Sequence, residues 1–434
     1  MCRWLFPVRL FRYARANMAA CIMRHRDAGK DLDAGSTVLA GPLRVAVRSA
    51  ERAEEERAGE PVSNSVRPDR WDFDVLISGM VFLDIVFTDL PCPPSPGTEV
   101  WSGGMGSSPG GIANLAVATS RLGLRTALVA GFGDDGYGQW CRQVLAGQEA
   151  VDLSLSRTFE HWHTPVTVSM AYQNDRAMVT HGHPAPMSAT EMIGNLPSTR
   201  AVLVELEGDP WWKPAQQAGA LVFADVGWDP SGRWDRRILD QLDGCHAFMP
   251  NEVEAQEYTR TTSPEAALAV LAELVPLAVV TRGSCGVLAI DTESGEQVEV
   301  ASLPVTAIDP TGAGDVFGAS LVVGTLAGWP LADRVRFSAL CASLAVQQFG
   351  GALAAPGWGD IADWWAALIQ RDAAGDPRAR QLRESYAFLP GVLPAEPAKA
   401  IRRAEATIAR LSDADEKILG SHDASVLTQR LPVQ

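Results

Sequence analysis

The most informative segment reads Asp309-Pro310-Thr311-Gly312-Ala313-Gly314-Asp315, and an apolar stretch that starts at Val316 follows it directly. The apolar stretch predicts a buried helix with three very small residues at its start. Backbone N–H groups are unpaired at that point, and together with the helix dipole they favour a bound anion. Asp315 falls in the first turn, where a carboxylate beside a phosphate can accept the proton of an attacking hydroxyl. The alternative is an ordinary glycine-containing helix start whose acid only complements the dipole.

From residue 71 to about residue 370, short apolar runs that predict strands alternate with segments of helical spacing. This alternation is typical of a mainly parallel sheet covered by helices, so we expect an α/β fold. Only the segment 153–183 differs, because two β-type runs, 164–172 and 176–180, are separated by a polar turn. It predicts an antiparallel hairpin, which could form a small sheet together with a strand at 85–90.

A second glycine-rich segment, residues 103–111, precedes a predicted helix that contains Asn114. Gly110 and Gly111 would let the backbone approach a ligand closely, and the Asn114 carboxamide offers a donor and an acceptor to a hydroxyl. The alternative is a flexible loop before a helix.

Residues 131–136 match G-x-G-x-x-G, but the negative charges of Asp134 and Asp135 would repel a pyrophosphate, so we do not interpret these residues as a dinucleotide site. The sequence has no Walker G-x-x-x-x-G-K-[ST] motif.

The order of these motifs resembles the ribokinase family of carbohydrate kinases, also called the PfkB family. The resemblance covers residues 72–370, and the segment around Asp315 is its most specific part. The matching motifs are, in order, Gly79 with Asp84, Gly110-Gly111-x-x-Asn114, Gly131-x-Gly133-Asp134-Asp135-x-x-Gly138, Asn251-x-x-Glu254, Thr281-x-Gly283-x-x-Gly286 and the segment 309–315. The resemblance implies a ribokinase-like three-layer α/β/α domain at 71–370 with a small β-sheet lid, whose strands would lie near 85–105 and 153–183.

The resemblance also implies a role for each matching residue. Asp315 would be the general base, and the N–H groups of Gly312, Ala313 and Gly314 would form an anion hole for the γ-phosphate of ATP. The other implied contacts are Asp84, Gly110, Gly111 and Asn114 for sugar hydroxyls; Asn251, Glu254, Thr281, Gly283 and Gly286 for the nucleotide and its Mg²⁺; and Asp309 and Thr311 for a monovalent cation such as K⁺. For Asn251 and Glu254, an ordinary helix cap is the alternative.

We therefore expect an ATP- and Mg²⁺-dependent kinase that phosphorylates a hydroxyl of a small sugar. The alternatives are a nucleoside kinase, a non-catalytic sugar-binding protein of the same fold and a nicotinamide oxidoreductase. We expect an unphosphorylated substrate, because residues 103–114 carry no basic residue and the segment 164–180 carries only Arg176, beside a turn where solvation is expected. Ile112 and the apolar loop 351–356 depart from the family pattern, and the loop weakens the inference of a cation site.

Composition limits the partners. Lysine and arginine total 37 against 52 acidic residues, and the net charge of −15 argues against a nucleic-acid-binding protein. No stretch is a convincing membrane span.

The seven cysteines are widely spaced without a C-x-x-C motif, so we expect buried thiols rather than a disulfide framework or a zinc ribbon. We expect a cytoplasmic protein, and a homodimer formed through the lid is a further expectation.

The two ends of the chain and four histidines lie outside these motifs. Residues 1–70 are expected to be a disordered extension, although the Arg-rich, acid-free segment 1–26 also fits a targeting peptide. Residues 371–434 are expected to be a helical or disordered extension. His161-x-His163 and His181-x-His183 could bind zinc if their strands meet, and the alternative is that these histidines face solvent or the substrate.

Overall fold

The structure is a computed structural model that describes residues 71–172, 175–206, 209–229, 231–348 and 350–397. The chain divides into two units between residues 69 and 70, and every element below belongs to the second unit, Arg70–Gln434. The expected N-terminal extension, 1–70, and the end of the expected C-terminal extension, 398–434, lie outside the described residues.

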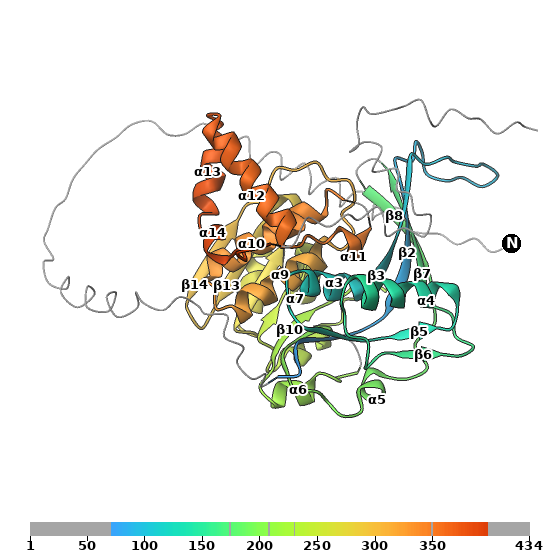
Figure 1. The fold of residues 1–434 in the computed structure, drawn as a ribbon. Coiled ribbons are helices and arrows are strands. Elements are labelled where there is room, and N and C mark those ends of the chain that lie inside the picture. Colours follow the sequence, from blue (N-terminus) through green and yellow to red (C-terminus); the bar gives the residue numbers. More distant parts are fainter. Residues whose placement is uncertain (1–70, 173–174, 207–208, 230, 349, 398–434) are drawn as a thin grey trace, which may run out of the picture. The chain divides into compact units, whose positions relative to one another are not determined.

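The central sheet of the described part has eight strands in the order β14-β13-β12-β11-β10-β9-β1-β4 (Figure 1). Six neighbours run parallel: β4 (Thr126–Val129), β1 (Phe73–Ser78), β9 (Thr199–Glu205), β10 (Leu221–Asp225), β11 (Ala247–Phe248) and β12 (Leu277–Thr281). Two antiparallel strands, β13 (Val287–Asp291) and β14 (Glu296–Val300), complete one edge.

Helices cover both faces of this sheet, which confirms the predicted three-layer α/β/α fold. Along β1, Val75 and Ile77 pack into one apolar cluster and Leu76 into the other, as the two-residue period of a strand requires. The first cluster includes residues of α3 (Ala113–Arg121), α9 (Ala313–Leu326), α10 (Leu331–Ala345) and α12 (Trp358–Ala373). The second includes residues of α5 (Ala189–Ile193), α6 (Lys213–Gln217), α7 (Glu252–Thr259) and α8 (Pro264–Leu271).

A second sheet lies at the right of Figure 1 and has the strand order β3-β2-β7-β8; we call it the lid. Its strands are β2 (Val81–Thr88), β3 (Gly104–Gly111), β7 (Val166–Tyr172) and β8 (Asp175–His181). The strands β7 and β8 form the predicted antiparallel hairpin, and β7 pairs in parallel with β2. One expectation differs from the structure, because β2 begins earlier than predicted. The glycine-rich segment forms a strand, β3, so its alternative interpretation as a flexible loop is wrong. Glycines at these positions let β3 lie against β2 where larger residues would collide with it.

The compact region continues beyond residue 370, where we expected it to end. Helix α12 runs through this position, and α13 (Pro377–Ser385) and α14 (Leu389–Val392) follow it. Tyr386 and Leu389 are buried in the first apolar cluster. The polar composition concealed this packing, because α13 buries only Ala379 and exposes a largely charged remainder.

The cysteines follow the expectation only in part. Cys141, Cys245 and Cys341 are buried free thiols, whereas Cys92 is an exposed free thiol. Among the described residues, no helix combines the length and the apolar character needed to cross a membrane.

Candidate active site

Asp315 and Asn114 meet where the first turns of α9 and α3 approach each other. Asn114 Nδ2 donates a hydrogen bond to Asp315 Oδ2 at 2.8 Å. Burial raises the pKa of Asp315 to about 6, although this hydrogen bond and the charge of Arg176 oppose the rise. A carboxylate with such a pKa is ionised at neutral pH and is a stronger base than an ordinary aspartate. Asn114 Oδ1 is buried without a hydrogen-bond partner in the structure, so it can accept from a ligand hydroxyl.

Gly312 and Gly314 shape the start of α9. Gly312 has φ 75°, a left-handed conformation that favours glycine. A Cβ at position 312 would lie 3.2 Å from the Asn114 side chain, whereas a Cβ at position 314 would meet nothing within 4 Å. Ala313 N–H donates to Pro310 O at 3.3 Å. The helix start is therefore closely packed on the Asn114 side and open at Gly314, where an anion can approach.

Asp84 lies on β2 against the backbone of β3. Its carboxylate occupies the space that a Cβ at position 110 would need, so Gly110 is required there. Gly111 has φ 60° and turns the chain towards α3. Burial, and then the charges of Asp309 and Asp315, raise the pKa of Asp84 to about 7. The expected sugar-binding residues and the expected base therefore occupy one region.

The lid adds polar residues that the sequence analysis missed. Strand register and the alternation of faces place Thr88, Ser169 and Arg176 on the face that carries Asp84. The hydroxyls of Thr88 and Ser169 are buried without a hydrogen-bond partner. A buried polar group without a partner costs about 1–3 kcal/mol, so these hydroxyls suit a polar ligand.

Arg176 itself is partly buried, so our expectation that it is solvated is wrong. Its positive charge opposes the rise in the pKa of Asp84 and of Asp315, which shows that it lies near both carboxyls. The inference of an unphosphorylated substrate therefore loses one of its two grounds.

The Asn251-x-x-Glu254 motif forms the helix cap that was its alternative interpretation. Glu254 Oε2 accepts from Asn251 N–H at 2.9 Å, and Asn251 Oδ1 accepts from the N–H groups of Val253 and Glu254 at 2.9 and 3.1 Å. Burial raises the pKa of Glu254, and the charge of Asp315 raises it further. The cap therefore also holds a carboxyl group near the candidate base.

Asp225, the last residue of β10, is a further site residue that the sequence analysis missed. Burial and then the charge of Glu254 raise its pKa well above the usual range, and Asp315 adds to this rise. One feature of the sequence could have pointed to Asp225: it is an acidic residue at the end of a predicted parallel strand, and open α/β sheets bind ligands at the carboxyl ends of their strands. Two carboxyls beside the candidate base supply the oxygen ligands that Mg²⁺ prefers.

The turn after β12 lies beside this cap. Asn251 pairs with Thr281 as an isolated bridge, and Thr281 N–H donates to Pro250 O at 3.1 Å. Gly283 and Gly286 have φ 53° and 91°, and a Cβ on Gly286 would have too little room. The structure therefore brings Thr281 to Asn251, and the two glycines shape the turn.

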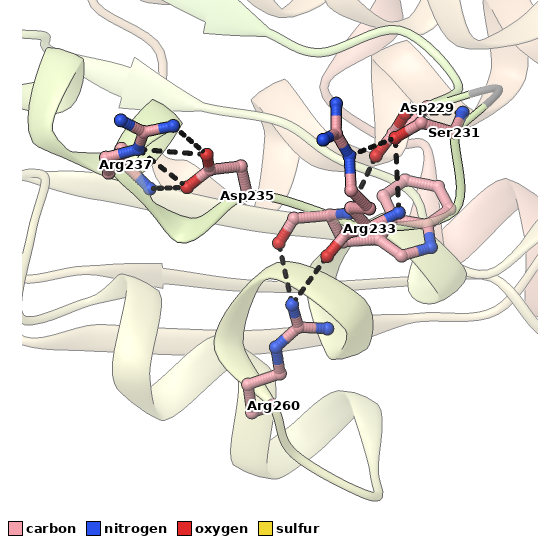
Figure 2. Close-up of polar contacts among 7 residues, drawn as sticks. Asp229, Ser231, Arg233, Asp235, Arg237 and Arg260 are labelled. Atoms are coloured by element: carbon pink, nitrogen blue, oxygen red, sulfur yellow. Dashed lines mark hydrogen bonds and ion pairs between the residues drawn. The ribbon is translucent and has the colours of Figure 1, made fainter.

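A cavity of about 540 Å³ lies beyond the carboxyl ends of β9 and β10 and is lined in part by Tyr258. Figure 2 shows the loop at its border. Arg233 Nε donates to Ser231 Oγ at 3.2 Å, and Arg260 donates to the carbonyl oxygens of Arg233 and Trp234 at 2.8 and 2.9 Å. These guanidinium groups contact the described part of the loop that borders the cavity.

Asp309 joins two loops beside Asp84. Its Oδ1 accepts from Thr311 N–H at 3.0 Å and its Oδ2 from Gly350 N–H at 3.3 Å. The Thr311 hydroxyl is buried without a hydrogen-bond partner. These oxygens are of the kind that binds a monovalent cation, although the carboxylate already orders the two loops.

The G-x-G-x-x-G segment has a structural role. Asp135 Oδ1 accepts from Gly138 N–H at 2.8 Å and caps α4 (Gly136–Arg142), while its Oδ2 accepts from Thr164 N–H at 2.8 Å. Asp135 therefore ties the start of α4 to the chain that enters β7.

Comparison with known proteins identifies the family. Residues 81–357 match the profile of the pfkB family of carbohydrate kinases. The chain belongs to the PfkB family. It is a carbohydrate kinase, and its acceptor class is a sugar or a nucleoside, which confirms the family, the fold and the enzyme class expected from the motifs.

The names of the similar proteins indicate several different phosphate acceptors. Fructoselysine 6-kinase of Escherichia coli (strain K12) is 29% identical over 56% of this chain and 91% of its own length. A nucleoside kinase of Methanothermobacter thermautotrophicus is 28% identical over 64% of this chain and 91% of its own length. Among solved structures, ribokinase of Arabidopsis thaliana complexed with ribose and ATP is 25% identical, with a TM-score of 0.56, over 66% of this chain and 96% of that one. These similarities support the class of reaction and leave the acceptor open.

Proposed function

We propose that this PfkB-family protein transfers the γ-phosphoryl group of ATP to a hydroxyl of a small sugar, with Asp315 as the general base. The observation that carries the proposal is the position of Asp315 in the first turn of α9. Asn114 holds its carboxylate, the Gly312–Gly314 segment lies beside it, and Asp84 lies close enough for its pKa to respond to Asp315. Groups suited to hydroxyl binding, proton removal and anion binding therefore occupy one region.

In this proposal, Asp84 and Asn114 hold the sugar through its hydroxyls, and the small residues Gly110 and Gly111 let the backbone approach it. Asp315 accepts the proton of the attacking hydroxyl while the new O–P bond forms and the bond to the ADP oxygen breaks. The N–H groups of Gly312 and Gly314 stabilise the charge on the transferred group, whereas that of Ala313, also expected to contribute, donates to Pro310 O in this structure. Alignment and fixed electrostatics supply most of the rate enhancement in such reactions.

The residues present fit a nucleotide and Mg²⁺. Asp225 and Glu254 offer carboxylate oxygens, and Asn251 and Thr281, with the turn glycines Gly283 and Gly286, would border the nucleotide. Mg²⁺, when bound, neutralises charge on the phosphate oxygens. The Arabidopsis ribokinase solved with ATP supports ATP as the donor. K⁺ at Asp309 and Thr311 is a further candidate, supported by the unpartnered Thr311 hydroxyl.

A sugar is preferred because the lid face presents two unpartnered hydroxyls and the Asp84 carboxyl, which suit a molecule with many hydroxyls. A nucleoside is the second candidate, favoured by the Methanothermobacter relative. We also propose pairing of two copies through the lid, since β8 is an edge strand on which Met178 and Val179 are 54% and 62% exposed. The cytoplasmic location expected from the sequence stays a prediction.

The test is ADP release with ATP and Mg²⁺ over a panel of neutral sugars, sugar acids, sugar phosphates and nucleosides. Asp315→Asn is the control, and we expect a sugar-dependent signal that this variant loses. Sugar binding without turnover in the wild type would instead support the non-catalytic alternative, and turnover of nucleosides alone would support the second candidate.

A further inference from the structure

Three histidines outside the candidate active site converge at the base of the lid hairpin. His163, His181 and His183 each offer one ligand atom, and these atoms all lie within 4.8 Å of one another. We propose that this cluster, which we call the histidine triad, binds a divalent transition-metal ion, Zn²⁺ in particular. The ion would clamp the two ends of the β7–β8 hairpin together. This inference is independent of the phosphotransfer proposed above.

The backbone holds the triad together before any ion binds. His181 pairs with Val166 across the hairpin. Gly182 lies so close to Pro165 that a Cβ would come within 2.7 Å of the proline Cβ, so only glycine fits between the two exposed histidines. Trp162 Nε1 donates to Pro184 O at 3.2 Å and ties the two segments together just outside the triad. The two segments that carry the histidines are therefore already fastened to each other.

The rings need only a small adjustment to bind an ion. The centroid of His163 lies 5.0 Å from that of His181 and 5.0 Å from that of His183, and the remaining pair is 5.3 Å apart. A tetrahedral zinc with Zn–N bonds of about 2.0–2.1 Å places its nitrogens about 3.3 Å apart. Rotation of the two exposed rings can supply this contraction, because terminal torsions of histidine are soft.

One nitrogen of His163 already has an oxygen neighbour. His163 Nδ1 lies 3.3 Å from Thr164 O. When Nδ1–H donates to a carbonyl, Nε2 is left unprotonated for a metal, and metal-binding histidines usually have such an outer partner. His163 therefore has an outer neighbour of the kind found around metal ligands.

The surroundings favour a transition metal over Mg²⁺. Three imidazoles suit zinc, copper or nickel, whereas Mg²⁺ prefers oxygen ligands such as those of Asp225 and Glu254. A cavity of about 360 Å³ beside His163 and His181 leaves room for water as a fourth ligand. Asp135 also borders this cavity, but its oxygens accept from Gly138 and Thr164. The net charge of −15 attracts cations to the surface in general.

The position of the triad gives a bound ion a structural consequence. His163 lies just before β7, and His181 and His183 lie at and after the end of β8. An ion would therefore join both ends of the hairpin that carries Ser169 and Arg176. Because Thr164 is also tied to Asp135, the clamp would extend to the start of α4. We expect bound Zn²⁺ to raise the unfolding temperature.

The experiment titrates tag-free, full-length protein with Zn²⁺ by calorimetry in the presence of excess Mg²⁺, which occupies carboxylate sites. We expect one Zn²⁺ per chain, with an affinity that falls more than about 10-fold in His181→Ala and in His183→Ala. The matched control is His161→Ala, which removes the other histidine of the H-x-H pair and lies outside the triad; its affinity should match the wild type.

Two readouts guard against misfolding and against binding elsewhere. Both test positions are exposed, and circular dichroism should show unchanged folding of the variants. Co²⁺ in place of Zn²⁺ should give the intense visible absorption of a tetrahedral or five-coordinate site in the wild type and lose it in both variants. The proposal is overturned if the wild type shows no saturable Zn²⁺ binding, if excess Mg²⁺ abolishes it, or if both variants retain it.

Discussion

Replacing Asp84 with asparagine should stabilise the protein at neutral pH while impairing its use of sugar. Burial and the charges of Asp309 and Asp315 raise the pKa of Asp84 from 3.8 to about 7. The folded state therefore binds the Asp84 proton more tightly than the unfolded state does. The resulting stability is fully present below pH 3.8 and is lost as the pH rises towards 7. The asparagine side chain would carry no charge at any pH and would avoid this loss.

The size of the effect follows from the shift. Each pKa unit is worth about 1.4 kcal/mol, so a shift of about 3 units corresponds to at most about 4 kcal/mol at pH 8. Between pH 5 and pH 8 the wild type should lose about 3 kcal/mol relative to Asp84→Asn. Urea unfolding of both proteins at pH 5 and pH 8 measures this difference directly.

Asp74→Asn is a matched control of opposite sign. Burial alone would raise the pKa of Asp74, but hydrogen bonds from Arg125 and Arg200 outweigh it and lower the pKa. Its charged form therefore stabilises the fold, and Asp74→Asn should be less stable than the wild type at pH 8. If Asp84→Asn is no more stable than the wild type at pH 8, or if its advantage is the same at pH 5, the electrostatic reasoning is refuted.

Four further predictions concern activity. Asp315→Asn should fold normally and lose about 10²–10⁴-fold in kcat, and the wild-type kcat/KM should fall as the pH drops through about 6; retention of half the rate would exclude the base role. Gly110→Ala should displace Asp84 and raise KM for sugar far more than KM for ATP; equal effects on both would contradict this. Arg176→Gln should move the acid limb of the pH–rate profile to higher pH, because the Arg176 charge lowers the pKa of Asp315, and Arg176→Lys should return the limb to its wild-type position. An unchanged limb in Arg176→Gln would show that the Arg176 charge does not affect Asp315. Protein that starts near residue 68 should remain soluble and active, and insolubility would show that residues 1–70 support the fold.

The parts of the site that the sequence predicted are those set by local backbone chemistry. A helix start needs its small residues within one turn of each other, so the segment ending in Asp315 is recognisable from seven consecutive positions. Asn114 is similar, because it follows a glycine pair at the start of a helix. Their meeting, with a hydrogen bond of 2.8 Å across 201 positions of sequence, came only from the family resemblance and not from the residues themselves.

The residues that were missed depend on long-range register. Arg176 reaches the Asp84 face only because β8 pairs with β7 and β7 pairs with β2, and a slip of one residue at either pairing would turn it outward. The sequence indicates a hairpin but not its third partner, so solvation was the natural expectation for Arg176. Asp225 was missed for the same reason: a strand-terminal acid becomes informative only once Glu254 is placed beside it.

Four acidic side chains of the candidate site share one electrostatic feature. Asp84, Asp225, Glu254 and Asp315 all have raised pKa values, and burial is the largest cause for each. A fold selected only for stability would replace such groups with apolar ones, since burying an unpaired carboxylate is costly. Each acid at this edge therefore needs a compensating partner, and the fold supplies such partners only in part, through Asn114, Arg176 and the backbone N–H groups of Val226 and Asn251. A Mg²⁺–nucleotide complex and a hydroxylated acceptor would supply the remainder, which is why the electrostatics support a phosphotransfer site more strongly than any single motif does.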